Sequence, residues 1–387
     1  MKKIISLVLL FAMTITLCAC TSQPAATHDN ETKPDASVDP VENSDENVSG
    51  SEMNFEDEGY KIAYILNAAT TEIFEMAFES AKTEGKKLGI TVDCYSSDGD
   101  DLKYQDMVSQ CVELGYDGLL LSHLKSEYAY DLVMGLLEKG IEVTVNDCVF
   151  IGPDGAECNI EGVTRMTQDD WAMTHDSLDY MVNMVLADKE RPLKVIKLWT
   201  GPGIVSMDQR QEEYKLWEEQ GLIETLEIIG PTDPTNREGS VCANLSAVLA
   251  KYPEGSVDFI WSAYDAYARG ALQALLDAGR TDIPIVTIDV SNQDLNYMLE
   301  YPDIWRGCCC THYATVGEQG VRITAMRLHG DDDQLEEFYM LKPSLLTSEQ
   351  IKTGMNVLNL NEHIEGYGVN DDHLTDWMKE VQKRLGY

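Results

Sequence analysis

The fold is decided by one short strand and the two segments that follow it. The strand is the nearly all-apolar run Lys61-Ile62-Ala63-Tyr64-Ile65-Leu66, which is typical of a strand buried on both faces of a sheet. An amphipathic helix follows, because apolar side chains recur at helical spacing from Phe74 to Leu88 and Gly89 closes the segment. A second strand at Thr91–Tyr95 then completes a strand-helix-strand unit, which has a right-handed crossover when its strands are parallel.

The same alternation continues along the chain. Helices are predicted at 104–114 and 127–139, and strands at 118–122 and 142–146. After a loop rich in Gly, Pro and Asp the pattern restarts, with predicted helices at 170–186, 209–220, 239–251 and 267–278 and predicted strands at 193–198, 224–229, 259–262 and 285–288. The predicted fold class is therefore α/β, with two lobes that each contain a doubly wound parallel sheet.

The first twenty residues are predicted to be a signal peptide. Lys2 and Lys3 precede an apolar run at 4–13, which is too short to be a permanent membrane span. The run ends in Leu17-Cys18-Ala19-Cys20, which resembles the lipobox of bacterial lipoproteins. The resemblance implies that Cys20 is lipidated and becomes the mature N-terminus, whereas the alternative is a plain secretory signal with incidental cysteines. Two acyl chains are sufficient for stable membrane anchoring.

Residues 21–59 are predicted to be an acidic, disordered tether. The segment is rich in Ser, Thr, Asp, Glu, Asn and Pro, so it cannot bury enough apolar surface to offset its ordering entropy. No later segment approaches the length of a membrane-spanning helix. The predicted location is therefore extracytoplasmic, with the protein anchored to the cell membrane by its lipid.

The net charge excludes one large class of partners. The chain carries 67 acidic and 29 basic side chains, for a formal charge of −38. Because nucleic-acid binding requires Lys and Arg to displace phosphate counterions, we expect no nucleic-acid partner.

Sequence motifs also argue against an enzyme. Gly201-Pro202-Gly203 lacks the third glycine of a dinucleotide fingerprint, and the chain has no Gly-Lys-Ser/Thr phosphate loop. No Cys/His spacing is typical of a zinc site, so we expect neither a catalytic residue, nor a cofactor, nor a metal. Most of the cysteines are expected to be buried small apolar residues. The sequence does not decide whether Cys148 and Cys158 form a disulfide.

Several segments of both lobes resemble the ribose/galactose-type periplasmic binding proteins, which have the type I fold. The matching motifs in the first lobe are Gly85–Ile90, Gly115–Leu121 and Lys139–Val143, and those in the second lobe are Gly270–Leu275 and Ile285–Asp289. The resemblance covers about residues 60–360.

This resemblance implies a particular division of the chain. The N-terminal lobe is expected to contain residues 60–160 plus 312–342, and the C-terminal lobe residues 161–311 plus 343–387 with a terminal helix. Three hinge crossings are expected to join the lobes, near 159–162, 310–313 and 341–344.

The resemblance also implies a function. Members of this family close two lobes on a small solute, chiefly a monosaccharide or related polyol, and present it to an ABC permease in the membrane. We therefore expect a monomeric solute-binding lipoprotein of a sugar ABC transporter. The alternatives are a ligand-sensing lobe for a membrane kinase or chemoreceptor, and a binder of another small solute such as a nucleoside or an autoinducer-type sugar. Repressors of the lactose type share the fold, but their helix-turn-helix is absent here.

By position, the resemblance implies a ligand site at the carboxyl ends of the strands. Carboxylates and guanidinium groups make strong hydrogen bonds to sugar hydroxyls, and aromatic rings stack on the apolar C–H faces. Phe74 is expected to be the stacking platform, Asp147 and Asp289 the hydroxyl acceptors, and Arg210 the donor. The remaining expected contacts are Tyr264, Thr311 and His312.

Some residues at the expected site have an alternative role, and two positions depart from the family pattern. Phe74 fits the apolar face of its helix equally well, and Arg210 could pair with an acidic residue of its own helix. Cys148 stands where the family frequently has Arg, and Tyr264 where it frequently has Asn. Ribose in particular is therefore not supported as the ligand.

Overall fold

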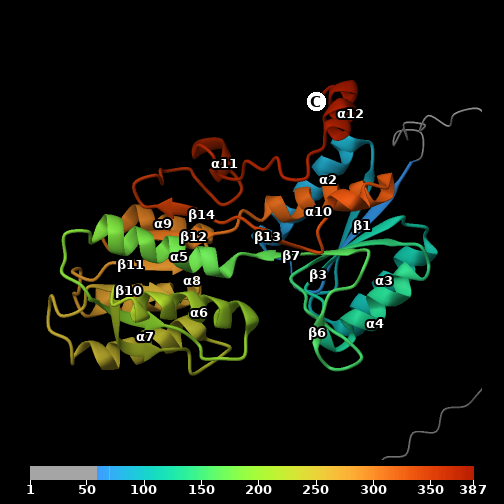
Figure 1. Cartoon of the computed structure of the whole chain (residues 1–387). Coiled ribbons are helices and arrows are strands. Elements are labelled where there is room, and N and C mark those ends of the chain that lie inside the picture. The colour runs from blue at the N-terminus through green and yellow to red at the C-terminus, as the bar shows by residue number, and fades with distance from the viewer. Residues whose placement is uncertain (1–58, 69) are drawn as a thin grey trace, which may run out of the picture. The chain divides into compact units, whose positions relative to one another are not determined.

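The computed structural model describes residues 59–68 and 70–387, which form two six-stranded sheets with helices on both faces (Figure 1) and one two-stranded hairpin. The predicted signal peptide, Cys20 and nearly all of the predicted tether lie outside the described residues. The α/β fold class with two parallel-sheet lobes is confirmed.

The first sheet is entirely parallel and has the strand order β13-β7-β4-β3-β1-β2. Helices α2 and α10 pack on one of its faces, and α3 and α4 pack on the other. We call this sheet and its helices the first lobe. Its elements are β1 (Lys61–Leu66), α2 (Glu72–Leu88), β2 (Thr91–Ser96), α3 (Asp101–Glu113), β3 (Gly118–Ser122), α4 (Ser126–Leu137), β4 (Glu142–Asn146), β7 (Val163–Gln168), α10 (Ala314–His329), the 3-10 turn η2 (Asp332–Gln334), β13 (Phe338–Leu341) and α12 (Asp376–Leu385).

The second sheet has the order β14-β12-β11-β10-β8-β9, in which only the edge strand β14 is antiparallel. Helices α7, α8 and α9 pack on one face, and α5 and α6 pack on the other. We call this the second lobe. Its elements are α5 (Asp170–Asp179), the π-helical turn η1 (Tyr180–Val185), β8 (Leu193–Leu198), α6 (Val205–Glu219), β9 (Ile223–Ile229), α7 (Arg237–Leu249), β10 (Phe259–Ser262), α8 (Asp265–Asp277), β11 (Ile285–Ile288), α9 (Asn292–Glu300), β12 (Trp305–Cys310), β14 (Ser344–Thr347) and α11 (Leu360–His363).

Local sequence chemistry sets the helix ends of the first lobe. Helix α2 ends at Gly89, whose φ of 73° lies in the left-handed region that glycine adopts without strain. Helix α3 starts three residues before the prediction, because the Asp100 side chain accepts hydrogen bonds from the Leu102 and Lys103 N–H groups. Helices α2 and α10 lie close together, since a Cβ on Gly317 would stand 2.1 Å from the Ala77 carbonyl oxygen.

The chain passes from the first to the second lobe later than predicted. Strand β7 pairs with β4 in the first sheet, so the first crossing follows Gln168 instead of lying near 159–162, and the boundary at 160/161 is wrong. The Arg165 side chain within β7 interrupts the apolar pattern, which is why this strand was not predicted. The other passages follow Cys310 and Leu341.

The terminal helix belongs to the first lobe, so its predicted assignment to the C-terminal lobe is also wrong. Helix α12 packs against α2, as Figure 1 shows at the C-terminal end of the chain. Its Met378 side chain is fully buried in the first lobe's core, and Gln382 Nε2 donates to Glu84 Oε1 at 3.1 Å. The chain thus returns to the first lobe after α11, which packs in the second.

The loop between β4 and β7 contains a short hairpin that the sequence did not predict. Its strands are β5 (Phe150–Ile151) and β6 (Glu157–Cys158), which pair antiparallel. Cys148 precedes β5, and Cys158 is the last residue of β6. Both have free thiols, as do the other cysteines in the part of the chain that the structure describes.

Candidate functional site

A cavity of about 630 Å³ lies between residues of the two lobes. Most of the first-lobe lining comes from the carboxyl ends of β3, β4 and β7, where parallel α/β sheets bind their ligands. The second lobe contributes the start of α5 and the start of α6. The lining residues are His123, Leu124, Ser126, Asp147, Cys148, Val149, Ile151, Glu157, Arg165, Thr167, Gln168, Asp170, Ile204, Val205, Ser206, Gln209, Tyr313 and Phe338.

Three residues that follow strands hold unusual backbone conformations beside this cavity. His123 after β3, Asp147 after β4 and Asp289 after β11 have φ values of 62°, 49° and 69°. Left-handed backbone is uncommon outside glycine and clusters at functional sites. Each of these turns starts at the carboxyl end of its parallel strand, where the side chain is presented to the cleft.

Asp147 lines the cavity, as the sequence suggested for a ligand acceptor. Its Oδ1 accepts a hydrogen bond from Thr167 Oγ1 at 2.8 Å, and its Oδ2 accepts one from Asn146 Nδ2 at 3.3 Å. The ring Nδ1 of His123 lies 3.9 Å from Oδ2. No arginine or lysine pairs with this carboxylate among the ion pairs of the described residues, so its remaining lone pairs are available to hydroxyl donors.

Arg210 connects two carboxylates of the second lobe. Its Nε donates to Asp170 Oδ1 at 2.6 Å, and its Nη1 lies 3.3 Å from Asp289 Oδ2 and also donates to the Ala263 carbonyl oxygen. Only 3% of the Arg210 side chain is exposed, compared with 26% of the Asp289 side chain. The pairing partner is thus Asp170 on α5, and not an acidic residue of the arginine's own helix.

The two carboxylates share a single positive charge. Burial raises the pKa of Asp170 to about 7, and the neighbouring charges of Asp289 and Asp147 act in the same direction while Arg210 opposes them. Burial also raises the pKa of Asp289, again against the guanidinium. The site therefore carries excess negative charge when all three aspartates are ionised.

Aromatic side chains lie on the first-lobe side of the site. Phe74 makes edge-to-face contacts with His123 and Tyr313, with ring centroids 5.2 and 5.6 Å apart. Tyr313 itself lines the cavity, and burial raises the pKa of its hydroxyl, which therefore stays a hydrogen-bond donor. Phe74 is half-buried behind these two rings and does not line the cavity itself.

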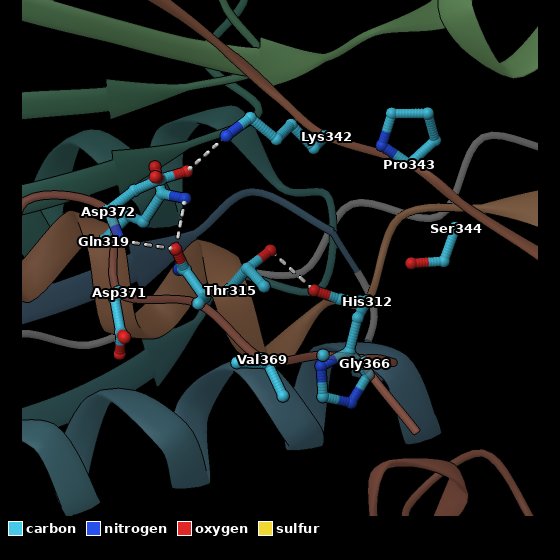
Figure 2. A pocket seen from close by; sticks show the side chains of 12 residues that line it. His312, Thr315, Gln319, Lys342, Pro343, Ser344, Gly366, Val369, Asp371 and Asp372 are labelled. Carbon is cyan, nitrogen blue, oxygen red and sulfur yellow. Dashed lines mark hydrogen bonds and ion pairs between the residues drawn. The ribbon is translucent and has the colours of Figure 1, made fainter. Parts of the chain in front are cut away.

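Three of the expected contacts lie elsewhere. Tyr264 is half-buried, stands edge-on to Tyr267 at 5.5 Å and packs between the two cores of the second lobe. Thr311 is buried, and its hydroxyl has no hydrogen-bond partner. His312 lines a different pocket of about 230 Å³ (Figure 2). Of the seven expected residues, only Asp147 lines the cavity. Arg210 is hydrogen-bonded to Asp170, which lines the cavity, and Asp289 is paired with Arg210.

The pocket around His312 is formed by the connecting segments and the C-terminal chain. Lys342 is turned toward Asp372 (Figure 2), and its Nζ lies 3.6 Å from Asp372 Oδ2. Gln319 Nε2 donates a hydrogen bond to Asn370 Oδ1 at 3.1 Å. A Cβ on Gly368 would stand 2.4 Å from His312 Nδ1, so the chain requires glycine there. Burial lowers the pKa of His312 to about 4, which makes this imidazole neutral at physiological pH.

Asp170 and Gln168 are among the polar groups of the cavity that sequence reasoning missed. Asp170 starts a predicted helix directly after Asp169, and this pair of acidic residues was the available signal. Gln168 also lines the cavity, and its buried Oε1 has no hydrogen-bond partner. Gln168 ends β7, the strand that was not predicted, and Asp170 follows it. Within residues 59–68 and 70–387 no cluster of His, Cys, Asp or Glu could hold a metal ion.

Comparisons with known proteins agree with this architecture. Residues 62–332 match the family model of the periplasmic binding protein domain. The structure of a sugar ABC transporter protein from Yersinia enterocolitica is 32% identical, with a TM-score of 0.66, and the match covers 85% of this chain and 96% of that one. The chain belongs to the type I periplasmic binding protein family. A search of curated protein sequences gave no match.

Two further solved structures share the fold of this chain. One is a 5-methylthioribose transporter solute-binding protein from Thermotoga lettingae, solved with 5-methylthioribose; it is 19% identical with a TM-score of 0.64, and the match covers 84% of this chain and 97% of that one. The other is the Caulobacter myo-inositol binding protein, solved with myo-inositol; it is 17% identical with a TM-score of 0.58, over 75% and 94% of the two chains. The family is extracytoplasmic, and in the part of the chain that is described no helix has the length and apolarity to cross a membrane.

The raised pKa of Asp170 predicts a pH dependence of stability. Because the folded-state pKa of about 7 lies above the usual value, the native protein binds more protons than the unfolded chain between about pH 4 and 7. This group's contribution to the free energy of unfolding therefore falls as pH rises through that window. We expect the melting temperature of the ligand-free wild type to fall more between about pH 5 and 8 than that of Asp170→Asn. If the melting temperatures of the two proteins changed equally over this pH range, the raised pKa would not belong to Asp170.

Proposed function

We propose that this protein is an extracytoplasmic solute-binding lipoprotein that captures a monosaccharide or related polyol between its two lobes and delivers it to an ABC permease. The observation that carries the proposal is the cavity whose polar wall holds Asp147 and the Asp170–Arg210–Asp289 cluster. Each sugar hydroxyl can donate to a carboxylate, and the charge makes such bonds stronger than neutral ones. The ligand is bound and released without turnover.

Closure on the ligand follows from the way the chain connects the lobes. The passages after Gln168, Cys310 and Leu341 are short segments between two packed sheets. Rigid lobes joined by such segments can rotate about them, and a ligand that contacts both lobes stabilises the closed arrangement by its differential affinity. Asp147 from the first lobe and Asp170 from the second supply contacts on both sides.

The permease is the proposed acceptor of the closed, liganded form. The similarity to a sugar ABC transporter protein, which covers 85% of this chain, supports this partner. We propose that the protein acts as a monomer.

Loss of Asp147 is expected to abolish most of the sugar affinity. Removal of one charge-assisted hydrogen bond costs roughly 1.5–3 kcal/mol, which corresponds to about a 10- to 100-fold rise in Kd. We would screen the domain from residue 59 onward by thermal shift against ribose, galactose, 5-methylthioribose, myo-inositol, nucleosides and amino acids, and then measure Kd by titration calorimetry. A ligand at 100 times its Kd raises stability by about 2.7 kcal/mol.

The variant to compare is Asp147→Ala, with Asp106→Ala as the matched control. Asp106 is exposed on α3 and does not line the cavity. The control should bind like the wild type. If only nucleosides or amino acids bind, the sugar or polyol assignment is wrong, and unchanged sugar affinity in Asp147→Ala would place the site elsewhere.

Membrane anchoring is proposed to depend on Cys20. Cys20→Ser removes the sulfur that would carry the diacylglycerol, so the full-length protein should move from the detergent phase to the aqueous phase in a Triton X-114 partition. Cys18→Ser is the matched control and should stay in the detergent phase. Equal partitioning of wild type and Cys20→Ser would contradict lipidation.

A further inference from the structure

The part of the cavity bordered by the β5–β6 hairpin has a different chemistry from the Asp147 wall. Val149 and Ile151 reach the cavity from the hairpin and the turn before it, and Phe338 reaches it from β13. From the second lobe, Ile204 and Val205 at the start of α6 line the same cavity. We call these five side chains the apolar flank.

Three members of the apolar flank are unusually exposed for their type. Ile151 is 37% exposed, Ile204 51% and Val205 59%. Isolated apolar side chains on a protein surface need no explanation, but a group of them that lines one cavity marks a binding surface. The flank is continuous with the polar site, because one cavity of about 630 Å³ contains both. That volume falls within the roughly 300–1,000 Å³ of sites that hold drug-sized ligands.

The hairpin that forms this flank is fixed to the sheet by Arg165. The guanidinium Nη1 and Nη2 donate to Glu157 Oε1 at 3.2 and 3.3 Å, and Nη1 donates to the Cys148 carbonyl oxygen at 3.4 Å. The guanidinium carbon also lies 5.1 Å from the centre of the Phe338 ring. The first-lobe part of the flank is thus held in place by a buried arginine, and a wall that is ordered before binding loses little entropy when a ligand arrives.

We infer that the ligand of this protein is a sugar or polyol that carries an apolar substituent, and that the substituent lies against the apolar flank. The inference rests on the proposed function, because the hydroxyl-bearing part of the ligand must bind at Asp147 and Asp170. The substituent is an alkyl, thioalkyl or aryl group, since the five side chains of the flank offer it only carbon. Each methylene or methyl group buried there improves Kd by about four-fold.

The test compares sugars with and without such a group. Titration calorimetry on the wild type would use matched pairs: ribose with 5-methylthioribose, galactose with isopropyl thiogalactoside, and myo-inositol with a mono-O-methyl inositol. In at least one pair the substituted member should bind at least four-fold more tightly than its parent. Ile204→Ser should then weaken binding of the substituted member several-fold more than binding of the parent sugar.

The matched control is Leu216→Ser, which makes the same kind of change on the same helix. Leu216 is 47% exposed on α6 and does not line the cavity, so this variant should bind both members of the pair like the wild type. Retained binding of the parent sugar shows that each variant is folded.

The outcomes separate this inference from the proposed function. If parent sugars bind and no substituted member binds more tightly, the inference is overturned and the proposed function stands. If the substituted member binds more tightly but Ile204→Ser leaves its advantage intact, the substituent lies elsewhere and the inference is overturned. If no sugar or polyol of either kind binds, the proposed function fails.

Discussion

The buried guanidinium of Arg210 is the constraint on which the ligand-facing side of the second lobe depends. An arginine does not lose its proton in a protein, so burial obliges the fold to bring acceptors to it. The acceptors are Asp170 at the start of α5, Asp289 in the turn after β11 and the Ala263 carbonyl oxygen after β10. Three separate segments are thus fixed at the carboxyl end of one sheet.

This arrangement also explains why the site suits an uncharged ligand with many hydroxyl groups. The single guanidinium faces two carboxylates, and Asp147 adds a third acceptor from the first lobe. Hydroxyl donors can satisfy the carboxylate oxygens that the arginine leaves free, whereas an anion would be repelled. Burial is the main cause of the raised pKa of Asp170, and the neighbouring carboxylates that add to this shift are the groups that favour hydroxyl donors.

How much the sequence revealed depended on whether a feature was local. Strand β1 was predicted within its observed bounds, because a run of apolar residues needs no information from elsewhere in the chain. Asp147 and Asp289 could be placed at strand ends for the same reason. The partner of Arg210 could not be predicted, since Asp170 lies 40 residues away and is brought near only by the packing of α5 on α6. Strand β7 was missed because the charged Arg165 interrupts its apolar pattern. The contacts of Arg165 with the β5–β6 hairpin cannot be predicted from a periodic pattern.

The C-terminal chain adds a constraint that the sequence did not suggest. Tyr367 packs in the second lobe, whereas Arg322 of α10 donates to the carbonyl oxygens of Asn370 and Asp372 and Met378 is buried in the first. This segment therefore connects the lobes again, and any rotation of one lobe against the other must also move it.

The most direct test of the account is a crystal structure of the protein with a bound sugar or polyol. We predict density for the ligand in the cavity that Asp147 and Asp170 line, with hydroxyl groups within hydrogen-bond distance of Asp147 and with Arg210 still paired to Asp170. A ligand bound away from these residues, or a cavity closed by the protein's own side chains at saturating sugar, would contradict it.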